Sequence, residues 1–169
     1  RTPRLTSAFV DAASGVQAFF KAEHLQRTGS FKMRGAANSV FSASEAAAAK
    51  GFVAHSAGNH GAALAAAAQG RGVPCTIVVP SDTPTAKVRN IERYGATVVL
   101  CEPTQRARSE TAEAEAAKLG GATIVHPYDD AAVIAGQGTI ALELLEEVPG
   151  LDAILVPTSG GGMLAGIAL

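Results

Sequence analysis

The sequence contains no tryptophan, only two cysteines among 169 residues, and no block of like charge. Because Cys75 and Cys101 are too few for a disulfide framework or a four-ligand zinc site, we expect two thiols in a reducing compartment. The formal net charge of −1 provides no basic patch for nucleic acid or for an anionic membrane surface. No apolar run approaches the length of a transmembrane helix, since even the run 62–68 is short. These absences argue against nucleic-acid and membrane partners.

The composition is that of a globular protein. Hydrophobic residues make up 47% of the chain and charged residues 17%, which is enough to bury a sizeable core. The chain begins with an arginine and shows no secretory signal, so our default location is cytoplasmic, with an organelle after transit-peptide removal as the alternative. Residues 163–169 have the pattern of the first turns of a helix without a stop signal, so we expect a fragment that is truncated at both ends.

Apolar runs alternate with helical patterns along most of the chain. The predicted strands are 16–23, 52–55, 75–79, 97–101, 123–125 and 153–156, and the predicted helices are 29–42, 59–69, 85–94, 105–119 and 131–148. This alternation predicts an α/β fold with a mostly parallel sheet. Function in such sheets lies in the loops that leave the carboxyl ends of strands. Three such loops contain unusual residues: the segment after Glu23, the turn 56–59 and the turn 159–162.

The first loop, Thr28-Gly-Ser-Phe-Lys-Met-Arg-Gly35, places Lys32 near the start of a predicted helix. A helix N-terminus disfavours an extra cation, so the pKa of the Lys32 ammonium is expected to fall. A lysine with a lowered pKa has more neutral amine for reaction with a carbonyl compound. A solvated surface lysine is the alternative, but Phe31 and Gly35 beside it favour a packed segment.

The second loop, Ser56-Ala-Gly-Asn-His60, joins a predicted strand to a predicted helix. Ser56 or Asn59 is a candidate N-cap, and the exposed N–H groups of such a turn bind carboxylate or phosphate. A helix cap without a ligand explains the same residues. His55 and His60 are five positions apart and do not share a helical face, so we predict no metal site here.

The third loop, Ser159-Gly160-Gly161-Gly162-Met163, follows a predicted buried strand. Consecutive glycines let the backbone approach a ligand and direct several N–H groups towards a phosphate. The spacing of Gly160, Gly162 and Ala165 also fits a dinucleotide fingerprint, so a nicotinamide-binding Rossmann domain is a rival hypothesis. A tight turn without a ligand is a further alternative.

Taken together in this order, the three loops resemble the signature of the fold-type II (tryptophan synthase beta-like) pyridoxal-phosphate enzymes, and Ser-Ala-Gly-Asn-His points to the serine/threonine dehydratase and serine racemase branch. The resemblance continues through Val78-Val79-Pro80, Tyr94-Gly95-Ala96, His126-Pro127-Tyr128 and the run 135–139, so it covers nearly the whole chain. It implies two α/β lobes with mostly parallel sheets. We expect a large cofactor-binding lobe from residues 1–50 and 129–169, and a small lobe from residues 51–128.

The resemblance also implies roles for single residues. Lys32 matches the lysine that binds pyridoxal 5'-phosphate covalently and then moves the α-proton of the substrate. The other cofactor contacts implied are Phe31 beside the pyridine ring, Asn59 at the phenolic oxygen, and Ser159, Gly160, Gly161, Gly162 and Met163 around the phosphate, with Ser159 where the family has its first glycine. The implied contacts to the substrate carboxylate are Ser56, Ala57, Asn59, His60 and Arg108. The implied divalent-cation ligands and the partner of the pyridine nitrogen lie beyond Leu169, so no metal ligand is assigned.

The expected reaction is β-elimination of L-serine or L-threonine to a 2-keto acid and ammonia. Serine racemases have a serine at position 57, on the cofactor face opposite the lysine, whereas Ala57 has no proton to donate. Dehydration is therefore favoured, and serine racemase is the alternative activity. A non-catalytic fragment or regulatory relative is the rival of another class. The resemblance further implies a small amino-acid substrate and a homodimer when the protein is full length.

Overall fold

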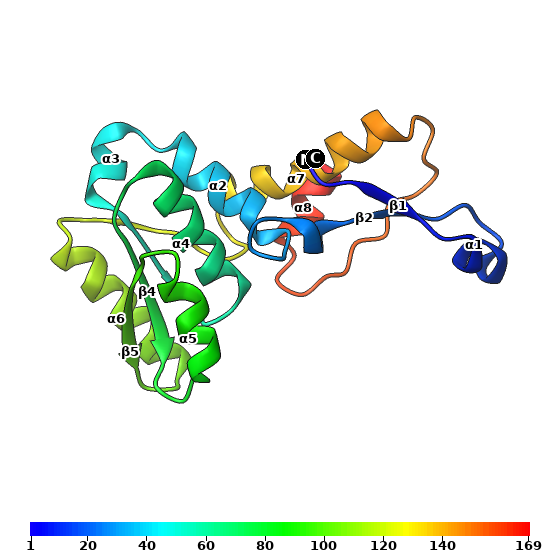
Figure 1. The fold of residues 1–169 in the computed structure, drawn as a ribbon. Coiled ribbons are helices and arrows are strands. Elements are labelled where there is room, and N and C mark those ends of the chain that lie inside the picture. The colour runs from blue at the N-terminus through cyan, green and yellow to red at the C-terminus, as the bar shows by residue number, and fades with distance from the viewer.

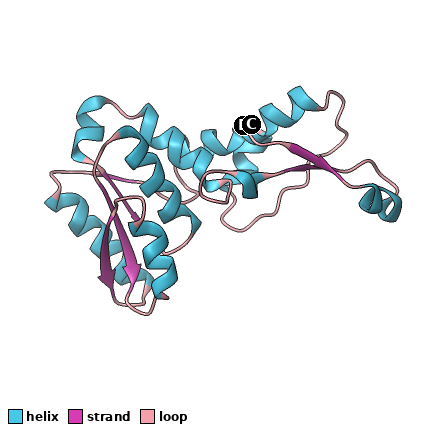
Figure 2. Cartoon of the chain, in the orientation of Figure 1, coloured by secondary structure: helices cyan, strands magenta, loops and turns pink.

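The computed structural model describes residues 1–169 as a helix-flanked parallel sheet from which a long arm extends (Figure 1). The strands are β1 (Arg4–Thr6), β2 (Phe19–Lys21), β3 (Phe52–His55), β4 (Cys75–Pro80), β5 (Thr97–Cys101) and β6 (Thr123–Ile124). The helices are α1 (Ala8–Ser14), α2 (Lys32–Ser42), α3 (Glu45–Lys50), α4 (Asn59–Arg71), α5 (Thr85–Glu92), α6 (Gln105–Lys118), α7 (Ala131–Glu147) and α8 (Gly162–Ala168), with a 3-10 turn, η1, at Glu23–Leu25. Figure 2 shows where the helices, strands and loops lie along the chain.

The main sheet has four parallel strands in the order β5-β4-β3-β6. Helices α4, α5 and α6 lie in the connections between successive strands, as parallel pairing requires. Because the strands are parallel, their carboxyl ends lie at one edge, where β3 ends at His55 and β5 at Cys101. This arrangement confirms the predicted α/β class and places the turn after His55 at the functional edge.

Alternate residues of the strands pack against helices on opposite faces of the sheet. Phe52, Ala54 and Ile77 belong to the larger core, which includes most of the alanines of α4, whereas Val53 and Val78 pack with alanines of α6. Helix α4 buries nine of its residues, mostly alanines, because it lies between the sheet, α2 and α5. The small side chains allow this close packing on several sides.

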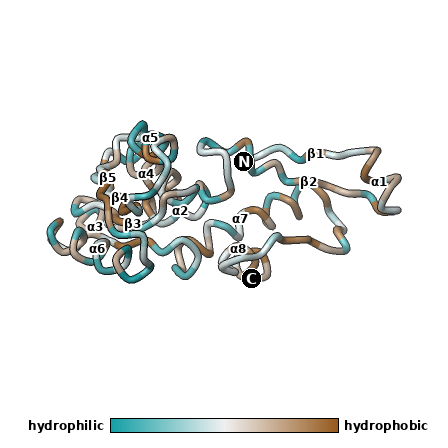
Figure 3. Tube along the Cα trace, turned by 90° about the horizontal axis from the view of Figure 1, so that it is seen from below, coloured by the Kyte–Doolittle hydropathy of each residue, from teal (hydrophilic) through white to brown (hydrophobic).

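The arm consists of the antiparallel pair β1–β2 and, at its tip, α1. Two views show α1 at the end of the molecule opposite the sheet (Figures 1 and 3). No residue of α1 is buried. The helix begins where Ser7 accepts a hydrogen bond from the N–H of Val10, and it ends at Gly15, whose φ of 73° suits glycine.

Three of the predicted elements differ from the structure by more than two residues at an end or in type. The predicted strand 16–23 is reduced to β2, because only its central residues pair with β1. The predicted helix 29–42 begins three residues late, at Lys32, after Gly29 takes a φ of 77°. The predicted buried strand 153–156 is wrong: the segment has no strand partner, and Leu155 is 90% exposed. It lies along an apolar cavity of about 840 Å³ between β2, α7 and α8, and a strand requires a partner for its backbone hydrogen bonds.

The parallel sheet comprises residues 52–124, and α2 with α7 connects it to the arm and α8. The lobe boundaries at residues 50/51 and 128/129 stay a prediction. None of the helices combines the length and the apolar composition that crossing a bilayer requires.

Candidate active site

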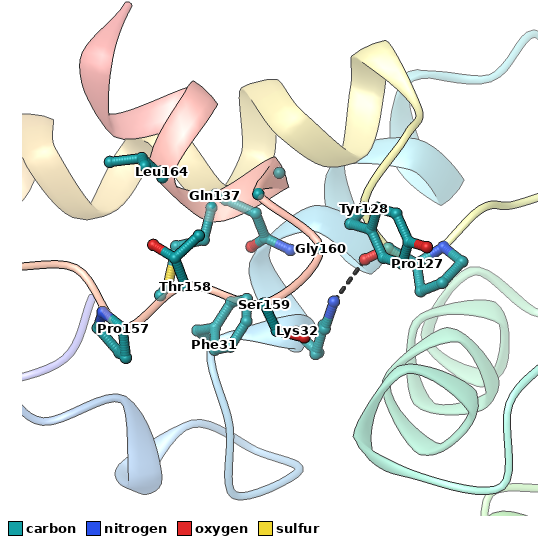
Figure 4. Close-up of a pocket in the computed structure, with 13 residues that line it drawn as sticks. Phe31, Lys32, Pro127, Tyr128, Gln137, Pro157, Thr158, Ser159, Gly160 and Leu164 are labelled. Atoms are coloured by element: carbon teal, nitrogen blue, oxygen red, sulfur yellow. Dashed lines mark hydrogen bonds between the residues drawn. The ribbon is translucent and has the colours of Figure 1, made fainter.

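A cavity of about 420 Å³ lies between the start of α2, the segment after β6 and the start of α8. Figure 4 shows the Lys32 amine pointing across it towards Pro127, with the Gly160 segment beside it. The lining residues are Phe31, Lys32, Pro127, Tyr128, Gln137 and the run 157–164. The first and third loops of the sequence, 130 residues apart, therefore contribute to one cavity.

Helix α7 brings these distant loops together because glycines let its neighbours approach closely. A Cβ on Gly136 would lie 2.6 Å from the carbonyl oxygen of Arg34, so α2 crosses α7 with the two backbones nearly in contact. Two residues later, on roughly the opposite side of α7, Gly138 packs in the same way against Gly166 of α8. The close crossing requires residues without a side chain. Helix α7 thus sets the distance between the start of α2 and the start of α8.

The helices that begin around the loops found in the sequence have no side-chain cap. Helices α1, α3, α6 and α7 are each capped by a serine, threonine or aspartate side chain. In contrast, α2, α4 and α8 begin after Phe31, Gly58 and Gly161 without a side-chain hydrogen bond, as does α5 after Pro84. The first N–H groups of a helix need partners. In α2 the N–H groups of Met33 and Arg34 already donate to the carbonyls of Ser30 and Phe31, so it is the starts of α4 and α8 that keep N–H groups for an anionic ligand.

Lys32 is the first residue of α2 and is half-buried. Its Nζ donates a hydrogen bond to the carbonyl of Pro127 and lies 5.1 Å from the centre of the Phe31 ring. Burial lowers the pKa of the Lys32 ammonium below its ordinary value. The sequence predicted this direction from the helix N-terminus, whereas in the structure burial is the cause. A lysine of this kind can act as a nucleophile and as a base.

Arg34, two residues after Lys32, anchors the start of α2 in a buried charge network. Its guanidinium forms two hydrogen bonds to Glu23, of 2.7 and 2.8 Å, and two to Glu143, of 2.6 and 2.9 Å. Lys21 also pairs with Glu143, at 2.8 Å. Arg34 and the other hydrogen bonds hold the pKa of the Glu143 carboxyl far below its usual range. The network joins α2 to η1 and α7, and sequence patterns gave no sign of it.

The segment 125–129 lies beside the turn 159–162, and its Pro127 and Tyr128 line the cavity. The N–H of Val125 donates a hydrogen bond to the carbonyl of Val53. The side-chain Nδ1 of His126 accepts hydrogen bonds from the N–H groups of Tyr128 and Asp129. Tyr128 lies directly against Gly160 and Gly162, where any side chain would collide with it. Pro127, Tyr128 and Gln137 were not among the predicted site residues, although the sequence motifs contained all three.

The turn 56–58 does not line this cavity, and its predicted cap is wrong. Neither Ser56 nor Asn59 caps α4: the N-cap is Gly58, and Ser56 Oγ accepts a hydrogen bond from its N–H instead. Asn59 is exposed, and Ala57 is partly buried against the core. The side chain of Asn59 therefore remains free of the helix that it begins.

His60 is buried, and its Nε2 lies 3.0 Å from the carbonyl oxygen of Val125. Burial lowers the pKa of His60 to about 4, so the ring is neutral at pH 7 and Nε2 carries the proton that it donates. His60 thereby ties the start of α4 to the segment that contacts Lys32.

Arg108 lies near the start of α6, and its buried Nε has no hydrogen-bond partner. Burial lowers the pKa of His55, and the positive charges of the nearby His126 and Arg108 lower it further. These three basic groups therefore lie close together at the carboxyl edge of the sheet. His55 and His126 have ring centres 6.4 Å apart. This edge favours an anion.

The structure therefore separates the predicted residues into two groups. Those that line the cavity are Phe31, Lys32, Ser159, Gly160, Gly161, Gly162 and Met163; those that do not are Ser56, Ala57, Asn59, His60 and Arg108. The second group lies at the carboxyl edge of the sheet, next to the His126–Tyr128 side of the cavity. Their individual roles stay predictions.

Comparison with known proteins gives consistent matches along the whole chain. The model of a family described as "Pyridoxal-phosphate dependent enzyme" matches residues 1–169. The chain is 49% identical over 169 residues to a β-hydroxyaspartate dehydratase of Paracoccus denitrificans (strain Pd 1222), covering 100% of this chain and 53% of that protein. It is 51% identical over 169 residues to a serine racemase of Arabidopsis thaliana, covering 100% of this chain and 51% of that protein.

The fold is similar to that of a solved serine racemase from maize, with a TM-score of 0.96 and 43% identity. That match covers 99% of this chain and 50% of the maize protein. The chain thus spans about half the length of the relatives it matches.

Proposed function

Because the chain belongs to the family of pyridoxal-phosphate-dependent enzymes, we propose that it catalyses β-elimination of L-serine or L-threonine to a 2-keto acid and ammonia. The family's cofactor is pyridoxal 5'-phosphate. The activity, the substrates and the residue roles given below are parts of this proposal.

The residues of the cavity fit this cofactor. Its volume of about 420 Å³ is in the range of small-molecule sites. The lowered pKa of Lys32 leaves more neutral amine, which favours bonding to an aldehyde. No atom lies within 4 Å of the position that a Cβ on Gly161 would take, so there is open space beside this glycine. The helix that follows it, α8, has no side-chain cap, and such a start suits a phosphate. We therefore assign the aldehyde to Lys32, the ring to Phe31 and the phosphate to residues 159–163.

The bound cofactor supplies an electron sink for the bonds at the α-carbon of the substrate. Lys32 Nζ acts as the base that takes the α-proton, and its lowered pKa leaves more amine in the basic form. The turn 56–60 and Arg108 hold the substrate carboxylate through N–H groups and positive charge. Loss of the β-hydroxyl and hydrolysis then give one keto acid and one ammonia per substrate.

Ala57 is the observation that favours elimination over racemisation. Inverting the α-carbon requires a proton donor on the face opposite Lys32, and a methyl group cannot provide one. Elimination needs only the base on the lysine side. A positioned acid contributes about 10²–10⁴-fold to a proton transfer, so its absence slows racemisation by roughly that factor.

A test of the proposal compares L-serine conversion to pyruvate with formation of D-serine, measured by a coupled pyruvate assay and chiral chromatography. We expect pyruvate to form much faster than D-serine, and Ala57→Ser to raise racemisation relative to elimination. Lys32→Ala serves as the inactive control. D-serine formation as fast as pyruvate formation by the unmutated protein would contradict the Ala57 argument.

Serine racemase is the second candidate, because the Arabidopsis and maize relatives carry that name. The same assay distinguishes the two activities. A non-catalytic fragment or regulatory relative is the candidate of another class. It predicts that the chain produces neither pyruvate nor D-serine when supplied with pyridoxal phosphate and L-serine.

A further inference from the structure

Gln137, in the middle of α7, is a buried amide with one of its two polar atoms unpaired. It is 1% exposed, and its Oε1 accepts a hydrogen bond of 3.1 Å from the N–H of Gly35. Its Nε2 is buried and has no hydrogen-bond partner. The same side chain lines the cavity that contains Lys32 and the turn 159–162.

The orientation of the amide follows from its neighbours. If oxygen and nitrogen were exchanged, the NH₂ group would face the Gly35 N–H, and two donors would oppose each other. A Cβ on Gly35 would lie 2.5 Å from Nε2, so the glycine leaves the space that the amide occupies. The amide is therefore fixed with its oxygen on α2, which leaves Nε2 as a donor without an acceptor.

A purely structural role explains the oxygen of Gln137 but not its nitrogen. An unpaired donor away from water is destabilising, and the hydrogen bond from the Gly35 N–H requires only an acceptor oxygen. The nitrogen is accounted for if the cavity receives a ligand with an acceptor atom at that point.

The surroundings indicate an anionic acceptor. Lys32, a basic side chain, and the backbone of the glycine turn 160–162 line the same cavity, and both suit an anion. Figure 4 shows the Gln137 amide beside the Gly160 segment, and both line the cavity with Lys32. The contact of Gly138 with Gly166 keeps this part of α7 against the helix that begins at the turn.

We propose that Gln137 Nε2 donates a hydrogen bond to the phosphate group of the cofactor. Gln137 thereby acts as a side-chain phosphate ligand beside the backbone of residues 159–163, and it couples that phosphate to the start of α2 through Gly35. This inference rests on the proposed binding of pyridoxal phosphate, but not on which reaction follows.

The test compares binding of pyridoxal phosphate with binding of pyridoxal, which lacks the phosphate, by equilibrium absorbance titration. Gln137→Glu retains an oxygen for the Gly35 N–H and replaces the donor with a second oxygen. Gln137→Met removes both polar atoms at similar volume. Gln105→Met, at the exposed start of α6, is the matched control. The chemical shift of the bound phosphate in ³¹P NMR gives a readout independent of activity.

We expect both Gln137 variants to bind pyridoxal phosphate about tenfold more weakly or worse, since the hydrogen bond is to a charged group. Their affinity for pyridoxal should stay within about twofold of the parent, and the control should match the parent with both ligands. The ³¹P shift should move in Gln137→Glu.

Other outcomes overturn the proposal. Equal losses of affinity for pyridoxal phosphate and for pyridoxal would show that Gln137 only supports the fold. Unchanged affinity in Gln137→Glu would exclude the donor. An unmutated protein that binds the cofactor but forms no keto acid would contradict the elimination reaction alone, and one that binds no cofactor would overturn both proposals.

Discussion

Replacing Arg34 by methionine tests how the start of α2, and with it Lys32, is held in place. The Arg34 side chain is 6% exposed, and its two carboxylate partners Glu23 and Glu143 are 15% and 10% exposed. Methionine keeps the aliphatic length but removes four charged hydrogen bonds and those to Thr2 and Thr139. The carboxylates of Glu23 and Glu143 then lose the guanidinium that compensates their charge.

The expected loss is large because the remaining charges are buried. Removing one partner of a buried ion pair costs about 3–5 kcal/mol, whereas an exposed pair contributes less than about 1 kcal/mol. Lys21 still pairs with Glu143, at 2.8 Å, so Glu23 is the more poorly compensated carboxylate. For a chain of this length, the loss corresponds to a decrease in Tm of about 6–20 °C.

The loss should depend on pH in a defined direction. The pKa of Glu143 in the folded protein is lowered, chiefly by its hydrogen bonds from Arg34. A lowered folded pKa stabilises the protein above the unfolded value of about 4.3, and this stabilisation is lost as the pH falls towards the folded pKa. The difference between the parent and Arg34→Met is therefore largest near pH 7 and shrinks below about pH 4.

The assay is urea unfolding followed by circular dichroism at pH 7 and at pH 3. Arg34→Lys is the matched control, because it retains the charge but loses the two paired contacts. The double variant Arg34→Met/Glu143→Gln should lose at least about 1 kcal/mol less than the sum of the single variants. A loss below about 1 kcal/mol for Arg34→Met at pH 7 would refute the reasoning.

Three further predictions concern helix packing, His60 and the thiols. Gly136→Ala should cost about 1–3 kcal/mol or more, because the new methyl group would lie 2.6 Å from the carbonyl oxygen of Arg34; an unchanged thermal melting temperature would contradict the close crossing. Because the folded pKa of His60 is about 4 against an ordinary 6.5, its contribution is complete above pH 6.5 and decreases as the pH falls towards 4. The free energy of unfolding measured in urea should therefore fall by about 2 kcal/mol between pH 7 and pH 5 because of His60. His60→Gln should remove that part of the pH dependence. Burial raises the pKa of Cys75 to about 12, so iodoacetamide at pH 8 should label Cys101 first, and equally rapid labelling of Cys75 in mass spectra would contradict its burial.

The sheet and its helices could be predicted because their patterns are local. The run 52–55 is apolar and short, and the run 59–69 is rich in alanine; both became the elements expected, β3 and α4. The short helix α1 was not predicted, because seven residues give too few turns for a periodic signal. The predicted strand 153–156 was wrong because an apolar run specifies burial, while a strand also needs a partner.

The residues of the candidate site that belong to sequence motifs could be predicted, whereas its long-range contacts could not. Lys32 and Gly160 to Gly162 could be selected by their spacing and by the resemblance, and the matches to serine racemases confirm that resemblance. The contact of Gln137 with Gly35 joins residues 102 positions apart, and that of Arg34 with Glu143 joins residues 109 apart. Such pairs leave no periodic trace in one sequence, so only the packing of α2 on α7 reveals them.

The central claim is that Lys32 is the residue that binds pyridoxal phosphate covalently. The most direct measurement is to add pyridoxal phosphate to the protein, reduce it with borohydride, digest it and locate the label by mass spectrometry. The account predicts label on the peptide that contains Lys32, and its loss in Lys32→Ala together with the cofactor absorbance. Label on Lys21, Lys50, Lys87 or Lys118 instead, or a normal cofactor spectrum in Lys32→Ala, would contradict it.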